Sequence, residues 1–514
     1  PFAMAMGTYS SMLRSTGDAL TPGLISVLTC ILDVIFNYVL INPTRTILLA
    51  GHSITVFGFG WGVPGAALGT ALSNVVGGLL ALALLLFRDG VLCIRRPGSW
   101  RITKACLQNL WKVGAPLAAE ALLAFFLEST FLGVLLFGRK RVSPKFYMVS
   151  AWLVWFGSAL SALWILIANS WMQTPAGAEL SADGSKAVIT DFLTAAMNPS
   201  VWPRYSHTIV AVLIMGAFVA MAVAGWYMLK GRNAEFAMKT MRIAAVVGIV
   251  TSCAMIVFAH SSAVVVWNEQ PTKLAMMEGM YDSEVPPLYA VGIVDEDNQE
   301  VIAPFAIPGG TSFLATGNFE TEYPGLNELA QTEEYGDMVV EDMPVGLVFQ
   351  SYHLMVAMYG LIMLTSILVL VFTFKGGRIA KMRWLQWAAV LSPIWPFIAI
   401  QTGWITAEVG RQPWVVYPSV TGPDGVSLLT ADGISMSVSA PELWLTLGLF
   451  VLVYLVLLIG WARVIGRFIK EGPVAEGAAA ADAAAVAVVA ADAEGDVVVA
   501  EAVAVAGDSG KEGE

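Results

Sequence analysis

The sequence predicts an all-α fold, a polytopic bundle of membrane-spanning helices. Apolar residues make up 57% of the 514 residues and charged residues only 13%, whereas soluble domains carry about 45–50% and about 25%. The mean hydropathy is +0.70, and several charge-free runs reach the roughly 20 apolar residues that a spanning helix needs. A soluble enzyme is therefore excluded. A nucleic-acid partner is excluded as well, because the net charge is −11 and no basic stripe is present.

Apolar runs of spanning length occur along most of the chain, so we expect about eight or nine transmembrane helices. They are predicted at residues 24–42, 64–87, 116–137, 147–169, 208–229, 242–266, 346–374, 385–406 and 443–468.

Loop charges predict the orientation, because Lys and Arg favour the cytoplasmic side. From residue 138 onward, basic loops alternate with loops that are acidic or nearly uncharged. Segment 263–345 holds sixteen carboxylates and one cation, Lys273, so it is predicted to be external and the C-terminal tail cytoplasmic. The alternation fails once, since 88–105 and 138–146 are both basic and only one span separates them. Either 101–115 re-enters the membrane or two unrelated proteins are joined near residue 115.

The two ends of the chain are unlike the middle. Residues 471–514 are low-complexity Ala, Val, Gly and acidic sequence, which predicts a disordered acidic tail. The chain begins Pro1-Phe2 without a start methionine, so we expect a fragment that lacks its true N-terminus.

Residues 1–113 contain the motifs LRSTGDALTP and GVPGAALGTALS, and between them a helix with Asp33 and Asn37. These pieces resemble the multidrug and toxin extrusion (MATE) transporters. The resemblance implies an alternative function, a cation-coupled multidrug antiporter fragment. A non-functional chimera of the two halves is a further alternative.

Residues 114–470 carry five motifs in order: GAPLAAEALLAFFLESTFLG, GSALSALWILIANSWMQTP, GWYMLKGR, QPTKLAMMEG and GWITAEVGRQPW. They resemble subunit I of the cytochrome bd-type quinol oxidases, in which segment 263–345 corresponds to the quinol loop. The resemblance implies a haem-containing quinol:oxygen oxidoreductase of aerobic respiration in a bacterial or archaeal cell (inner) membrane. Quinol would be oxidised at the outer face and oxygen reduced to water.

The same resemblance implies the cofactors and a partner. They are a low-spin haem b, a high-spin haem b, a third haem of type d or b, and a second oxidase subunit (subunit II) in the lipid bilayer. The family's first two helices, with a haem-ligating histidine, have no counterpart here, because the only histidine in 1–113 is His52, which we expect in a Gly-rich loop. We therefore expect a chain truncated at its N-terminus, whose oxidase activity is doubtful.

His207 begins a span at its external end. It is either an axial haem ligand or an interfacial histidine that faces headgroups. Met355 lies about ten residues inside another span, and His353 points roughly 200° away from it on a helix, so the two cannot serve one iron. The resemblance implies that His207 and Met355 ligate the iron of the low-spin haem b, and we favour Met355 over His353.

Glu408 lies on an apolar span with Trp404 one turn earlier. A carboxylate at that depth is costly unless it is paired, protonated or ligating. The resemblance implies that Glu408 ligates the iron of the high-spin haem b, with Trp404 beside it and with Arg411 and Gln412 near the haem propionates. The alternative is a structural ion pair between Glu408 and Arg411 at i,i+3.

Two further pairs are candidate catalytic residues. Glu120 and Glu128 lie eight residues, or about 12 Å, apart on one predicted helix, and the resemblance links them with the haem pair and proton delivery. Lys273 and Glu278 correspond to quinol-binding residues, and a carboxylate there can accept a quinol proton. The alternative for Lys273 and Glu278 is a surface ion pair, which contributes little.

Overall fold

The computed structural model describes residues 6, 9–10, 20–49, 52–87, 126–138, 141–181, 187–336, 338–423, 425–434 and 438–473. The chain forms two compact units. One comprises residues 1–111 with 436–439, and the other comprises residues 112–435 with 440–514.

The smaller unit is a pair of packed helices, α2 (Leu20–Ile41) and α3 (Val63–Phe87), joined by an antiparallel hairpin of β1 (Pro43–Leu49) and β2 (His52–Phe59). Small residues on α3 allow close contact, since a Cβ at Gly65 would overlap the Leu40 carbonyl. The predicted spans 24–42 and 64–87 are confirmed as helices. The prediction that His52 lies in a loop is wrong, because His52 begins strand β2, in which the β-branched residues Ile54, Thr55 and Val56 favour a strand.

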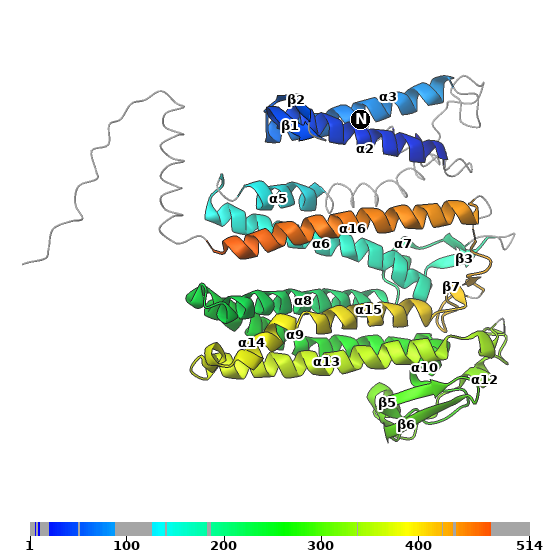
Figure 1. Cartoon of the computed structure of the whole chain (residues 1–514). Helices are drawn as coiled ribbons and strands as arrows, with labels where there is room; N and C mark the ends of the chain where they lie inside the picture. The colour runs from blue at the N-terminus through cyan, green and yellow to red at the C-terminus, as the bar shows by residue number, and fades with distance from the viewer. Residues whose placement is uncertain are drawn as a thin grey trace, which may run out of the picture. The chain divides into compact units, whose positions relative to one another are not determined.

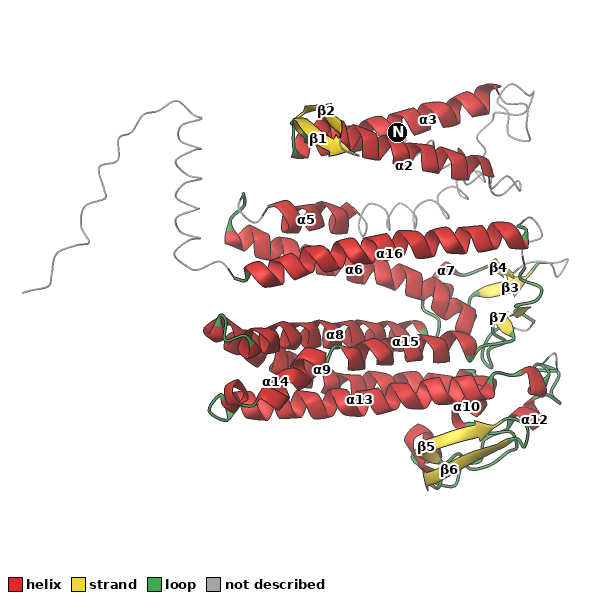
Figure 2. Cartoon of the chain, viewed as in Figure 1, coloured by secondary structure: helices red, strands yellow, loops and turns green. Residues whose placement is uncertain are grey.

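The larger unit is mainly helical (Figure 2). Its helices are α5 (Phe126–Phe137), α6 (Pro144–Gln173), α7 (Phe192–Ala196), α8 (Val201–Leu229), α9 (Ala234–Glu269), α10 (Pro271–Glu278), α11 (Gly310–Thr316), α12 (Leu326–Leu329), α13 (Val345–Phe374), α14 (Arg383–Leu391), α15 (Ile394–Val409) and α16 (Ala440–Glu471). Short 3-10 turns cover Val340–Asp342 and Arg378–Lys381. Three two-stranded antiparallel sheets complete the described part of this unit: β3 (Ala178–Leu180) with β4 (Ala187–Ile189), β5 (Leu288–Asp295) with β6 (Glu300–Ile307), and β7 (Trp414–Val416) with β8 (Leu428–Leu429).

Four helices form the centre of this unit. Helix α8 packs against α9 and α15, and α13 packs against the same two helices, so the four close into a ring; they run side by side in Figure 1. The half of the ring near α14 is filled by apolar side chains such as Phe218, Met221, Met241 and Leu385. Burial of these side chains removes apolar surface from solvent and holds the ring together.

Eight helices in the described part of the chain are long and apolar enough to cross a membrane. This agrees with the predicted polytopic bundle. Of the predicted span 116–137, the structure describes only α5. The predicted disordered tail lies outside the described residues beyond Gly472-Pro473.

Helix boundaries differ from the predicted spans where polar residues belong to the helix. Helix α8 begins at Val201 rather than 208, and it includes Arg204 and His207. Helix α9 covers Ala234–Glu269 rather than 242–266. A hydropathy criterion detects the apolar run alone, so it misses helical turns that carry charges and lie at the ends of a span.

The predicted quinol loop is a folded cap at one end of the bundle. Its core joins α10 to buried aromatic residues, among them Tyr323, Trp414 and Tyr417. Gly279 ends α10 at φ 69°, and a Cβ there would overlap the Val301 side chain. A residue that ends a helix in the left-handed backbone conformation, and that has no room for a Cβ, must be glycine.

Candidate functional site

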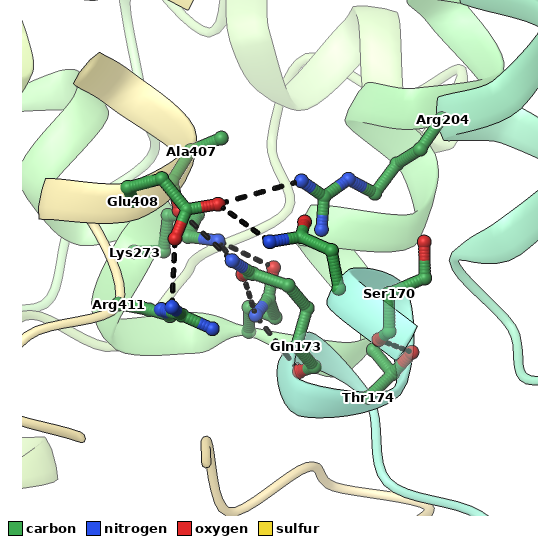
Figure 3. A network of polar contacts seen from close by, with 10 residues as sticks. Ser170, Gln173, Thr174, Arg204, Lys273, Ala407, Glu408 and Arg411 are labelled. Carbon is green, nitrogen blue, oxygen red and sulfur yellow. Dashed lines mark hydrogen bonds and ion pairs between the residues drawn. The ribbon is translucent and has the colours of Figure 1, made fainter. Parts of the chain in front are cut away.

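Glu408, near the end of α15, is the centre of a polar cluster drawn from three helices (Figure 3). Its Oε2 lies 2.7 Å from Nη2 of Arg411, and its Oε1 lies 3.9 Å from Nη2 of Arg204 on α8. Asn169 on α6 donates a hydrogen bond to Oε1 at 3.0 Å. The structural ion pair at i,i+3 is therefore formed, but it is part of a larger cluster with two guanidinium groups.

Arg204 joins this cluster to the face of α8 that carries His207. Its guanidinium carbon lies 5.9 Å from the centre of the Trp404 ring, within the range of a cation–π contact. Arg204 and His207 are three residues apart and so lie on the same side of α8. The sequence prediction that Trp404 and Glu408 share one face of α15 agrees with this geometry, because both face Arg204.

Lys273 on α10 is buried beside the same cluster, with 4% of its surface exposed. Its Nζ donates hydrogen bonds to Oε1 of Gln173 and, at 2.9 Å, to Oε1 of Gln270. A Cβ at Gly410 would lie 3.1 Å from Cγ of Lys273, so the lysine stem packs on the backbone between Glu408 and Arg411. Burial lowers the pKa of Lys273 well below its usual range, and the Arg204 charge lowers it further.

Glu278 lies at the other end of α10 and is fully buried. Neither carboxylate oxygen has a hydrogen bond of regular geometry. Burial raises the pKa of Glu278 to about 8, and the nearby Thr311 hydroxyl offsets part of this effect. The alternative of a surface ion pair between Lys273 and Glu278 is wrong, because both are buried and Lys273 bonds two glutamine side chains instead.

The segment after α15 holds α10 in place. The Tyr417 hydroxyl accepts a hydrogen bond from the Thr272 backbone N–H at 3.2 Å and shares a second, of 2.8 Å, with the Thr272 hydroxyl. Glu269 accepts hydrogen bonds from the hydroxyls of Ser419 and Thr421. Helix α10 is therefore anchored at its first turn, next to Lys273.

Met355 on α13 faces α15. A Cβ at Gly403 would lie 2.9 Å from the Met355 sulfur. His353 points elsewhere, since its ring stacks on Phe349 with centroids 4.0 Å apart and its Nδ1 lies 2.9 Å from the Phe349 carbonyl oxygen. The two side chains diverge, as the helical spacing predicts.

Of the remaining predicted site residues, Gln412 and Glu128 do not join the cluster. Gln412 accepts a hydrogen bond from the Thr430 hydroxyl at 2.8 Å, in the segment between α15 and α16. Glu128 is half-buried in the first turn of α5, which packs on α6. Glu120 lies outside the described residues.

Sequence reasoning missed Arg204, Asn169 and Gln173 as members of the site. Each is a polar residue inside or beside a predicted apolar span, in the segments NPSVWPRYSH and LIANSWMQTP. Polar residues in such positions are costly unless they are paired, so their presence was the available signal.

Several polar atoms of the cluster are buried without a hydrogen-bond partner: Nη1 of Arg204, Nε and Nη1 of Arg411, Oδ1 of Asn169 and Nδ1 of His207. Buried polar groups are nearly always satisfied. The guanidinium and imidazole atoms of this set match an anionic, iron-containing group, because guanidinium groups bind carboxylates and imidazole binds iron. Among the described residues no group of three His, Cys, Asp or Glu side chains could hold a bare metal ion.

The comparisons with known proteins identify the family of this chain. Residues 112–473 match the model of the family described as cytochrome bd terminal oxidase subunit I. The chain belongs to that family. Residues 1–111 lie outside this match, and the resemblance of the N-terminal segment to MATE transporters stays a prediction.

The matches to curated relatives from two bacteria each cover 74% of the relative's own length. The chain is 33% identical over 383 residues to cytochrome bd-II ubiquinol oxidase subunit 1 of Escherichia coli, covering 63% of this chain and 74% of that protein. It is 32% identical over 364 residues to cytochrome bd ubiquinol oxidase subunit 1 of Bacillus subtilis, covering 70% and 74%. Among solved structures, the bd oxidase from Geobacillus thermodenitrificans superimposes with a TM-score of 0.58 at 26% identity, covering 80% of this chain and 87% of that one.

Proposed function

We propose that this chain is the haem-bearing subunit of a quinol:oxygen oxidoreductase, which oxidises membrane quinol at the outer face and reduces oxygen to water. The polar cluster around Glu408 carries the proposal, because its buried, unmatched guanidinium and imidazole atoms fit haem better than they fit a purely structural network. Family membership and relatives whose names include ubiquinol oxidase support the same function.

Bound haem would supply one-electron transfer and oxygen chemistry. We assign His207 and Met355 to a low-spin haem b and Glu408 to a high-spin haem b. A third haem, of type d or b, is expected from the family. Arg204 and Arg411 would hold the propionate carboxylates, because each has a buried guanidinium nitrogen without a hydrogen-bond partner. Trp404 would lie against the haem edge beside Arg204.

We propose that Lys273 and Glu278, at opposite ends of α10, bind the quinol. A group with a pKa of about 8 both takes and releases protons near neutral pH. Glu278 therefore suits a proton acceptor for a quinol hydroxyl. The Nζ of Lys273 donates hydrogen bonds to the amide oxygens of Gln173 and Gln270, and it would also donate to a quinol oxygen. Glu120 and Glu128 are proposed to deliver protons to the oxygen site.

Orientation and partner complete the proposal. We propose that segment 263–345 lies outside a bacterial cell membrane and the C-terminal tail inside, and the Lys and Arg pattern of the loops supports this orientation. Helix α16 has no buried residue, so lipid or the second subunit would cover it. We expect subunit II as that partner, as in the family.

Optical spectra test the haem ligands. Met355→Leu keeps size and apolarity, so we expect the chain to insert normally while the low-spin haem becomes high-spin. His207→Ala should lose this haem. The matched control is His353→Leu, which should keep the low-spin spectrum. An unchanged spectrum in Met355→Leu, with loss in His353→Leu, would assign the iron to His353.

A further inference from the structure

The β5–β6 hairpin packs one of its two faces against the helix bundle. The Val301 side chain covers Gly279, and the Tyr289 ring lies 5.7 Å from that of Phe349 on α13. Gln350 donates to the Gly292 carbonyl at 2.8 Å. The hairpin is thus fixed to the flank of α13, where Figure 2 shows it beside the end of that helix.

The opposite face of the hairpin is apolar and uncovered. Val291 pairs with Phe305 across the strands, and Ile293 pairs with Ile302, so each pair points to one side of the sheet. These four side chains are 60%, 70%, 65% and 58% exposed, respectively. Beyond β6, the exposed rings of Phe313 and Phe319 stack with centroids 4.3 Å apart. We call the four hairpin residues Val291, Ile293, Ile302 and Phe305 the outer apolar face.

The contacts with α13 give the depth of this face along the bundle. At the hairpin turn, Glu296 accepts a hydrogen bond from the Gly346 N–H at 2.7 Å, and at the other end the Tyr289 ring lies 6.3 Å from that of His353. Seven helical residues correspond to about 10 Å. The hairpin therefore runs beside the first two turns of α13.

Helix α13 has 30 residues, or about 45 Å, which matches a bilayer with its headgroups. Its first two turns then lie at headgroup depth. Exposed Leu347 and Leu354 continue the apolar surface along α13 itself. The hairpin's carboxylates, Asp295, Glu296, Asp297 and Glu300, all gather at the turn, the end farthest from the hydrocarbon core.

We propose that the outer apolar face rests in the outer leaflet, at the boundary between headgroups and acyl chains. Interfacial elements elsewhere bury an apolar face about 5–10 Å into this zone while charges stay in water, and aromatic rings favour it. The inner face of the same hairpin covers Gly279, next to Glu278. The hairpin would thus separate that carboxylate from lipid.

Photocrosslinking tests the lipid contact. The full chain with its partner subunit carries benzoylphenylalanine in place of Phe305 and is reconstituted in phosphatidylethanolamine–phosphatidylglycerol vesicles. We expect lipid adducts by mass spectrometry in at least fivefold excess over the same probe at Asp297, in the turn. Lipid yields at Phe305 no higher than at Asp297, or a crosslink to a polypeptide instead, would overturn the proposal.

A second position makes the result independent of one substitution. Ile293 lies on the same face, and Asp342 serves as a second exposed control. Lipid adducts at Ile293 and not at Asp342 support the proposal, and equal yields contradict it. The readout needs no quinol turnover, so it stands or falls separately from the proposed oxidase function.

Discussion

At the scale of single residues, Glu278 gives the proposed quinol site its pH dependence. Its carboxyl is neutral below its pKa of about 8 and cannot then accept a quinol proton. We expect kcat/KM for quinol to rise about tenfold per pH unit below this value and to level above it. Glu278→Gln should abolish this rise of kcat/KM with pH, together with most of the activity. The control is Glu328→Gln, at an exposed position of the cap, which should keep the same pH dependence. If kcat/KM still rises with pH in Glu278→Gln, Glu278 is not the proton acceptor.

The candidate site could be predicted in part from single residues. Glu408 and His207 stand out because a charge or an imidazole in an apolar span is costly, and Lys273 stands out as the one cation of segment 263–345. Arg204 could not be paired with Glu408 in advance, because the two are 204 positions apart and only the packing of α8 on α15 joins them.

At the scale of elements, the contact between α13 and α15 sets the position of the Met355 sulfur. In Gly403→Ala the new methyl would lie 2.9 Å from this sulfur, so the thioether must shift. We expect the melting temperature to fall by only a few degrees while the low-spin haem spectrum changes. The control is Gly360→Ala, which meets nothing within 4 Å. A normal spectrum in Gly403→Ala would argue against Met355 as a ligand.

The anchor of α10 provides a second test at this scale. Tyr417→Phe removes the hydroxyl that holds Thr272, at a cost of about 1 kcal/mol in the free energy of unfolding. The KM for quinol should rise several-fold because Lys273 follows Thr272 directly. Tyr454→Phe on α16, where the residue is 65% exposed, should change neither thermal unfolding nor KM. An unaltered KM in Tyr417→Phe would separate α10 from quinol binding.

At the scale of the whole molecule, hydropathy predicts the bundle well because lipid requires long apolar helices. It does not predict how segment 263–345 folds. The core of that cap joins Leu274 and Met276 to Trp414 and Tyr417 from beyond α15. Such distant contacts leave no periodic pattern in the sequence, so the segment resembles an ordinary acidic loop.

The two compact units lead to the last prediction. The buried cluster of the smaller unit contains Tyr9, Ile25 and Ala81, whereas the two clusters of the larger unit begin at Val210 and Leu274. No buried core residue is shared among the described residues, and the family match starts at residue 112. Deletion of residues 1–111 should therefore leave haem content per folded protein unchanged, measured by pyridine haemochrome after size-exclusion chromatography. Deletion of α16 serves as the contrasting variant, expected to weaken retention of subunit II. Haem loss after removal of 1–111 would mean that the smaller unit stabilises the haem-bearing bundle.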